Sequence, residues 1–248
     1  MMRARCYGER SPKVDIFIDF RALLDRASAA RSGLLSSASK QRQDTNGHAQ
    51  DLSRKGPVTI RCGLTMSART PVGAIFEALK GSWRLKRSLN STLPGFPSGV
   101  FEGTATFSPR KSVAETVTGE LLYSEQGELK TDNGLTLKAN RKYIYRYTAH
   151  EDKISAWFVT EDSKTKDGAE EVDYLFHDLE MEKNEGAWTG KGEHLCELDM
   201  YWAYYEFRLK VVADVGQEMD VFGVRYKVKG PQKDYTSDTA YERMDDRK

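Results

Sequence analysis

The stretch LKGSWRLKRSL, residues 79–89, marks a change in the hydrophobic period of the chain. Before it, apolar residues recur at helical spacing. After it, polar and apolar residues alternate, which is typical of β-strands. Gly81 is placed to end a helix, and Trp83 follows at the head of the first strand. The stretch therefore predicts a helix followed directly by a sheet.

One short helix is expected immediately before this stretch. Thr70 followed by Pro71 is a typical N-cap and first helical position. Ile75, Phe76 and Leu79 fall on one face of the segment, so the helix is predicted to be amphipathic and about three turns long.

From residue 82 onward, nine or ten strand patterns follow one another with short connections. Asn133-Gly134 is the dipeptide that best suits a tight hairpin, and residues 189–213 are taken as a single strand pattern. No helical pattern separates the strands to allow a parallel crossover. Alternating polar and apolar faces favour a barrel over a sandwich. We predict an all-β fold, an up-and-down antiparallel β-barrel of 8–10 strands with one short N-terminal helix, which has room for one small ligand.

Residues 1–65 differ from the rest of the chain in charge and in aromatic content. They carry 12 Lys and Arg against 6 Asp and Glu, whereas residues 66–248 carry 26 against 31 and hold all four Trp. A basic segment with few aromatic residues buries too little surface to offset its ordering entropy. We expect residues 1–65 to form a mostly disordered extension, with Met66 as an alternative start, and residues 66–248 to form the barrel domain.

The expected location is cytoplasmic. A basic, Ser-rich extension leaves a mitochondrial transit peptide as an alternative, but Asp15, Asp19 and Asp25 count against it. No apolar run is long enough for a secretion signal or a membrane span. Of the three cysteines only Cys196 lies in the barrel domain, so a disulfide within that domain is not expected, and the cysteine spacing does not suit zinc.

The order of helix, Gly81-x-Trp83 and strand meander resembles the calycins, the superfamily of lipocalins and fatty-acid-binding proteins. The resemblance implies that the first-strand tryptophan lies across one end of the barrel and that an arginine from the last strand stacks on it. The matching arginine is Arg243. A guanidinium over an indole contributes about 1–2 kcal/mol when it is partly desolvated. Gly81, Trp83 and Arg243 are therefore expected to close the barrel rather than to bind a ligand.

Residues 75–243 more closely resemble domain-of-unknown-function family 6314. The resemblance is carried by words such as LKGSWRLKR, GVFEGTATF, HLCELDMYWAYYEF and YKVKGPQKDYTSDTAYER. Its signature residues are His194, Cys196, Asp199 and Tyr201, followed by Gly230, Pro231, Lys233, Asp234 and Tyr235. The resemblance implies a fold and brings no activity.

Two histidines and a cysteine are the first candidates for a site. Alternation puts His177 on one face with Leu175, and His194 on one face with Cys196. If both faces point inward, the three side chains meet in the cavity. A neutral imidazole there could orient a ligand or move a proton, and two His with a Cys could take a soft metal, although no metal is expected. The alternative is that all three are core residues.

Five further residues are expected to bind the ligand. Tyr143, Tyr145, Trp157 and Trp202 suit stacking on a planar molecule, and equally suit a plain core. Lys233, in a Gly-Pro turn, either shapes the last hairpin or meets an anionic ligand at the barrel mouth. Asp199 is expected to pair with Arg225 or Lys227 on a neighbouring strand.

The sequence therefore predicts a small-molecule-binding barrel that holds a hydrophobic or aromatic ligand. Three alternatives stay open: a cofactor-independent isomerase, cyclase or hydrolase that uses His177 or His194 as acid or base, a haem-binding barrel with one of these histidines as axial ligand, and an interaction domain with a filled interior. No cofactor is expected otherwise. Phosphate-loop, serine-elbow and HExxH motifs are missing from the sequence, and the net acidic barrel argues against nucleic acid. No membrane partner is expected, and the oligomeric state stays open.

Overall fold

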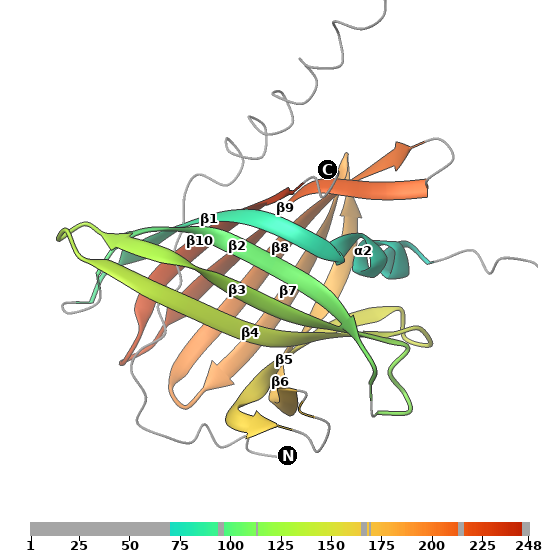
Figure 1. Cartoon of the computed structure of the whole chain (residues 1–248), viewed down its shortest axis with the longest axis horizontal. Helices are drawn as coiled ribbons and strands as arrows, with labels where there is room; N and C mark the ends of the chain where they lie inside the picture. The colour runs from blue at the N-terminus through green and yellow to red at the C-terminus, as the bar shows by residue number, and fades with distance from the viewer. Residues whose placement is uncertain are drawn as a thin grey trace, which may run out of the picture.

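The structure, a computed structural model, describes residues 70–93, 97–112, 114–164, 168, 170–212 and 216–244. One helix precedes ten strands (Figure 1). The elements are α2 (Pro71–Leu79), β1 (Gly81–Ser91), β2 (Gly99–Arg110), β3 (Gly119–Thr131), β4 (Thr136–Thr148), β5 (Lys153–Lys164), β6 (Glu170–Asn184), β7 (Ala187–Cys196), β8 (Asp199–Val212), β9 (Gly216–Lys229) and β10 (Asp234–Arg243). The expected extension, residues 1–65, lies outside the described residues.

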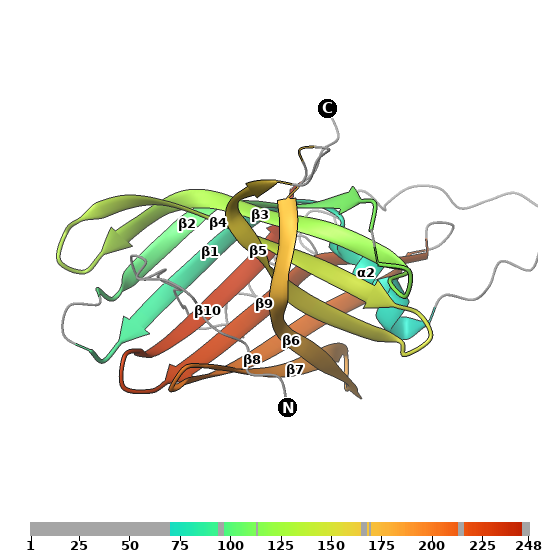
Figure 2. The ribbon, with the colours of Figure 1, turned by 90° about the horizontal axis from the view of Figure 1, so that it is seen from below.

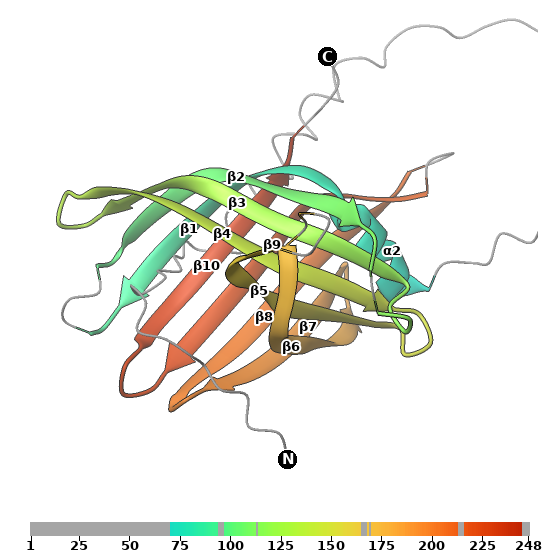
Figure 3. The same ribbon diagram turned by 60° about the horizontal axis from the view of Figure 1, so that its bottom comes forward.

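The ten strands form one closed barrel in which every strand pairs antiparallel with its neighbours in sequence. The sheet closes because β1 pairs with β10, in the order β1-β10-β9-β8-β7-β6-β5-β4-β3-β2. Figures 2 and 3 show the strands running obliquely around the barrel, with α2 at one end. The predicted up-and-down barrel with one N-terminal helix is confirmed. We call the end that carries α2 the closed end and the other the open end.

Two turns show where sequence patterns do and do not reveal a hairpin. The predicted Asn133-Gly134 turn joins β3 to β4, with Gly134 at φ +87°. The segment 189–213, in contrast, is two strands and not one, since it turns at Glu197 and Leu198 between β7 and β8. Glu197 adopts a positive φ of +54° there. Gly or Asn at this position would have indicated a turn in the sequence, because they adopt positive φ readily, whereas Glu gives no such indication.

A β-bulge in β6 changes which residues face the interior. Ala156 of β5 pairs with His177, but Trp157 pairs with Leu175, so Phe176 has no partner on β5. Both Phe176 and His177 are consequently buried, whereas Leu175 is 36% exposed. The expected shared face of Leu175 and His177 is wrong, because a bulge shifts strict alternation by one residue.

The closed end is sealed by side chains from the first and last strands. Trp83 is fully buried and its Nε1 donates to the carbonyl of Leu79 over 2.8 Å. The guanidinium carbon of Arg243 lies 4.0 Å from the centre of the Trp83 ring. Arg243 also donates to the carbonyls of Lys80 (2.6 Å) and Ala78. These groups therefore cap carbonyls at the end of α2 that have no partner within the helix.

The helix begins as its sequence predicts. The hydroxyl of Thr70 accepts a hydrogen bond from the backbone N–H of Gly73, and Pro71 occupies the first helical position. Phe76 stacks on Tyr147 of β4, with ring centres 5.5 Å apart. Because α2 buries its apolar face against the barrel interior, it serves as the lid of the closed end.

Replacing Arg243 by Lys should lower the free energy of unfolding by about 2–3 kcal/mol, because the three guanidinium nitrogens donate to three separate carbonyls while the planar group lies on the Trp83 ring, and a single ammonium nitrogen cannot reproduce that geometry. Urea titration followed by circular dichroism measures the change. The matched control is Arg84→Lys, since Arg84 lies on β1 and pairs with Glu242 at the surface. Equal effects of the two substitutions would contradict the role given to Arg243.

Candidate functional site

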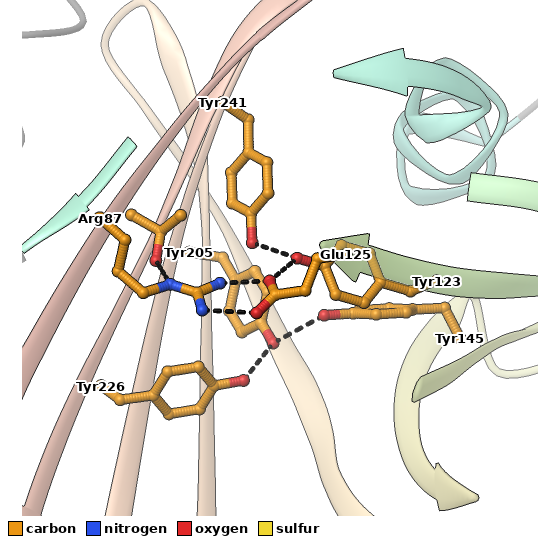
Figure 4. A network of polar contacts seen from close by, with 8 residues as sticks. Arg87, Tyr123, Glu125, Tyr145, Tyr205, Tyr226 and Tyr241 are labelled. Atoms are coloured by element: carbon orange, nitrogen blue, oxygen red, sulfur yellow. Dashed lines mark hydrogen bonds and ion pairs between the residues drawn. The ribbon is translucent and has the colours of Figure 1, made fainter. Parts of the chain in front are cut away.

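The middle of the barrel interior is polar and is organised around a buried ion pair (Figure 4). Arg87 of β1 and Glu125 of β3 are 5% and 3% exposed. The guanidinium donates to both carboxylate oxygens of Glu125, with an Nη1–Oε1 distance of 2.6 Å. Its Nε donates to the hydroxyl of Thr239 over 2.8 Å. Such a pair is costly to bury, so its groups must satisfy one another closely.

Two tyrosines complete this inner layer. The hydroxyl of Tyr123 donates to Glu125, which uses its only proton. In the 2.9 Å contact between the hydroxyls of Tyr123 and Tyr241, Tyr241 must therefore be the donor. Burial raises the pKa of Tyr123 well above its usual range, so the hydroxyl stays protonated. In this layer the proton of Tyr123 is thus directed at Glu125 and that of Tyr241 at Tyr123.

A second cluster centres on the hydroxyl of Tyr205. It lies 3.0 Å from Nε2 of His177, 3.0 Å from the hydroxyl of Tyr226 and 3.3 Å from that of Tyr145. His177 is 2% exposed, and burial lowers its pKa to about 3, so the imidazole is neutral at physiological pH. Gly192 gives the imidazole its space, because a Cβ there would lie 2.5 Å from the His177 ring.

A small interior cavity lies between the two clusters. Its volume of about 20 Å³ accommodates roughly one water molecule. The lining residues are Arg87, Tyr123, Glu125, Arg141, Tyr143, Tyr145, Val224, Tyr226, Ser237, Thr239 and Tyr241. Ser237 is 1% exposed, and its buried hydroxyl has no hydrogen-bond partner. The open space is thus smaller than the ligand expected from the sequence, and one polar group in its wall is unsatisfied.

Further toward the open end lies an aromatic cluster around His194. The His194 ring lies 5.4 Å from Phe176 and 5.9 Å from Tyr174, and Nε2 is buried without a hydrogen-bond partner. Burial lowers the pKa of His194, and a hydrogen bond with the backbone of Phe176 acts in the opposite direction. Lys233 lies beside Tyr201, with Nζ 5.4 Å from the ring centre.

The structure places only some of the sequence-predicted site residues at the interior cavity. Tyr143 and Tyr145 line the cavity, while His177 reaches it only through Tyr205. Phe176 contacts both His177 and His194, with ring centres 4.4 and 5.4 Å away, and neither histidine lines the cavity. Cys196 forms no disulfide with a described cysteine and is partly buried at the end of β7.

Both tryptophans expected to touch a ligand lie on the outer face of the barrel. The ring of Trp157 packs under Arg146, whose guanidinium carbon lies 4.7 Å away. Trp202 packs under Lys227 at 5.9 Å. The residue next to each tryptophan is buried in the interior: Ala156 beside Trp157, and Ala203 beside Trp202. Because side chains alternate along a strand, this pattern was sufficient to predict that both tryptophans lie on the outer face.

The expected partner of Asp199 is also wrong. Asp199 is 2% exposed and accepts from the backbone N–H groups of Gln232 and Lys233, at 3.0 and 3.2 Å. Its second oxygen lies 3.5 Å from Nζ of Lys233, while Arg225 pairs with Asp238 at 2.6 Å. Asp199 therefore holds the turn between β9 and β10 and places Lys233 at the open end.

Sequence reasoning missed the residues that make the interior polar, above all Arg87, Glu125 and Ser237. The signal was present: Arg87 alternates with Leu85 and Leu89 on a buried face. Alternation alone did not suffice to predict a buried Arg87, because charged side chains are rarely buried unless they are paired. The partner of Arg87, Glu125, lies 38 residues away in the sequence.

A larger concavity of about 540 Å³ lies on the outer face over β6 to β9. Its charged side chains are already engaged in ion pairs, such as Arg225 with Asp238 and Lys191 with Glu182. It offers no convergent buried polar group, so the interior is the better candidate site. Within the described ranges, no group of three metal-ligating side chains is close enough to hold an ion, and no helix is long and apolar enough to cross a membrane.

The fold and site together define a ten-stranded antiparallel barrel with a helical lid and a polar, tyrosine-rich interior. The chain belongs to the family described as "Family of unknown function (DUF6314)", whose model matches residues 79–243. This confirms the family resemblance drawn from the sequence.

No curated protein matches the sequence. A similar solved structure is that of an S-type phycobiliprotein lyase, CPES, from Guillardia theta, at 11% identity and a TM-score of 0.34, which covers 72% of this chain and 96% of that one.

Replacing Glu125 by Gln should lower the free energy of unfolding by about 3–5 kcal/mol, because Arg87 keeps its charge in the interior without a counterion. The double variant Arg87→Met/Glu125→Leu should recover most of this loss. Chemical denaturation measures all three proteins. As a control, Glu102→Gln breaks the exposed pair with Lys86 and should cost only about 0–1 kcal/mol. A double variant as unstable as Glu125→Gln would contradict the account.

Lowering the pH from 7 to 5 should reduce the stability of the fold. The folded-state pKa of His177, about 3, lies below its unfolded value. The unfolded chain therefore binds the extra proton first, and stability is lost as the pH falls below about 6.5. Between pH 7 and 5 the loss from this one group is about 2 kcal/mol. Urea midpoints at both pH values measure it.

The variant His177→Gln should lack this part of the pH dependence, and His150→Gln, which changes an exposed histidine, should retain it. If His177→Gln showed the wild-type pH profile, the assignment of the effect to His177 would be wrong.

Proposed function

We propose that the protein binds a small, planar molecule inside the barrel, next to the cavity between the two hydrogen-bonded clusters. The observation that carries the proposal is the buried hydroxyl of Ser237, which faces this cavity without a partner. Buried polar groups in proteins nearly always have partners. The partner of Ser237 is then either a water molecule or a polar group of a ligand that replaces it.

The walls of the cavity indicate which polar groups such a ligand carries. Tyr205 has one proton and three partners, so at least one of Tyr145 and Tyr226 must direct its own proton at Tyr205. Tyr241 likewise directs its proton at Tyr123. Tyr241 and at least one of Tyr145 and Tyr226 therefore offer an acceptor oxygen, and no hydroxyl proton, to the cavity. A ligand with a hydroxyl or N–H group therefore complements the site better than a plain hydrocarbon.

The surrounding aromatic rings suit the rest of such a ligand. Tyr143 and Tyr145 come from β4 and Tyr226 from β9, and all three rings border the cavity. Aromatic rings favour offset stacking on planar molecules. The ligand we propose is thus aromatic, as expected from the sequence, and also polar at its inner end.

The enzyme alternative has less support from the geometry. His177 is neutral, but its Nε2 contacts Tyr205 and reaches the cavity only through that residue. A haem in this cavity would need a histidine in its wall as axial ligand, and neither His177 nor His194 lines it. Of the two histidines, only His194 has an Nε2 without a partner among the described residues.

Naphthol and naphthalene provide a direct test, since they differ by one hydroxyl. Naphthol should bind the full-length protein more tightly than naphthalene in calorimetric titration. Ser237→Ala should weaken naphthol binding by roughly two- to tenfold, the range of one hydrogen bond, without affecting naphthalene or the melting temperature.

The control variant is Ser88→Ala, because Ser88 lies on β1 next to Arg87 and points away from the interior. It should bind both molecules as the wild type does. Absence of naphthol binding, or binding that does not depend on Ser237, would refute the proposed function.

A further inference from the structure

One ring, that of Phe176, lies between the interior cavity and the open end. Phe176 is the unpaired residue of the β6 bulge and is 5% exposed. Without the bulge its side chain would point to the outer face beside Asp178. Bulges are common next to binding sites, where they redirect a side chain. The local backbone thus places an apolar ring inside a polar barrel.

The ring of Phe176 stacks on two tyrosines that border the cavity. Its centre lies 5.8 Å from that of Tyr143, with an interplanar angle of 12°, and 5.6 Å from that of Tyr226, with an angle of 20°. Near-parallel rings at these distances are offset-stacked. Tyr143 belongs to β4 and Tyr226 to β9, which are five strands apart in both directions around the barrel. Phe176 therefore bridges two opposite walls.

On its other side Phe176 meets the aromatic cluster of the open end. Its ring centre lies 5.4 Å from that of His194 and 4.6 Å from that of Phe158. The buried Nε2 of His194, like the hydroxyl of Ser237, has no partner in the described part of the chain. The ring of Phe176 thus contacts His194 and also stacks on two tyrosines that border the cavity of Ser237.

The backbone around this ring is the least regular of the barrel. Pairs between β6 and β7 run from Asn184 and Ala187 only as far as Glu180 and Lys191. Toward the open end, the described ladder does not continue, and the β5–β6 register shifts at three places. With five residue pairs, the β6–β7 ladder is the shortest of those described, so this seam is the part of the wall that backbone pairing holds over the shortest distance.

We propose that Phe176 occupies the stacking subsite of the ligand and leaves it when the ligand enters through the seam between β6 and β7. The inference rests on the proposed function and names its ligand class. The ligand is a planar, fused-ring aromatic molecule with a hydrogen-bonding group at each end. The inner group bonds Ser237, the ring takes the place of Phe176 between Tyr143 and Tyr226, and the outer group donates to Nε2 of His194.

The test compares naphthol binding by the wild type, Phe176→Leu and Phe176→Ala in stopped-flow fluorescence. Leucine at position 176 keeps most of the apolar volume, so it leaves no large void, but it cannot stack on the tyrosine rings. The ligand should therefore displace it more easily than it displaces phenylalanine. When Phe176 fills the subsite in most molecules of the free protein, the apparent affinity for naphthol is the intrinsic affinity multiplied by the small fraction of molecules in which the subsite is open. Both variants should therefore bind naphthol at least about tenfold faster and more tightly than the wild type.

Phe207 is the matched control, because it is also buried and stacks on two rings, those of Tyr205 and Phe222, that do not line the cavity. Phe207→Leu should leave naphthol binding unchanged. Phe207→Ala could create an unrelated void, so Ser237→Ala is added to each alanine variant. It should weaken naphthol binding to Phe176→Ala, whereas any additional binding in a void left by Phe207→Ala should not depend on Ser237.

The outcomes separate the two proposals. If the wild type binds naphthol through Ser237 but the Phe176 variants bind no faster, the subsite is wrong and the proposed function stands. If no protein in the set binds, both fail. If the Phe176 variants unfold at the assay temperature, the same comparison is made with Phe176→Tyr, which keeps the ring and should bind as slowly as the wild type. Faster binding by that variant would also overturn the subsite.

Discussion

The register between β1 and β10 is the constraint on which the rest of the structure depends. This one ladder sets Trp83 opposite Arg243, and Arg87 opposite Thr239. The first pair seals the closed end, and the second brings the buried guanidinium to one of its acceptors. Because side chains alternate between faces, a slip of one residue would move every one of these groups to the outer face. Closure of the sheet and the polarity of its interior are thus specified together.

A polar interior stabilises a barrel less than an apolar interior filled with residues such as leucine would. Replacing buried ion pairs by well-packed apolar residues is often neutral or stabilising, so the pair of Arg87 and Glu125 is not explained by stability. What it provides is a fixed arrangement. With Glu125 occupied by three donors, the hydroxyl protons of Tyr123 and Tyr241 have defined directions. The chemical character of the cavity wall follows from these directions, which is the property that ligand discrimination requires.

The sequence predicted the architecture well because most of its elements have a local signal, the turn between β7 and β8 being an exception. Thr70 and Pro71 start the helix, Asn133-Gly134 makes a hairpin, and alternation marks the strands. The interior was harder to predict because its groups are paired across the barrel. Arg87 finds Glu125 on another strand, and no local pattern reveals that partner. The prediction for the two tryptophans was wrong for a different reason. Their large aromatic side chains favoured contact with a ligand, whereas alternation places Trp157 and Trp202 on the outer face.

The bulge in β6 connects this arrangement to function. Strict alternation would have given β6 a regular ladder and a row of inward leucines, with Phe176 outside. The inserted residue instead leaves the β5–β6 register irregular toward the open end and turns an aromatic ring between Tyr143 and Tyr226. Local opening in proteins concentrates where backbone hydrogen bonds are few. The same residue therefore weakens the wall and fills the space behind it. A closed barrel needs both features if its interior is to be protected and still be reached.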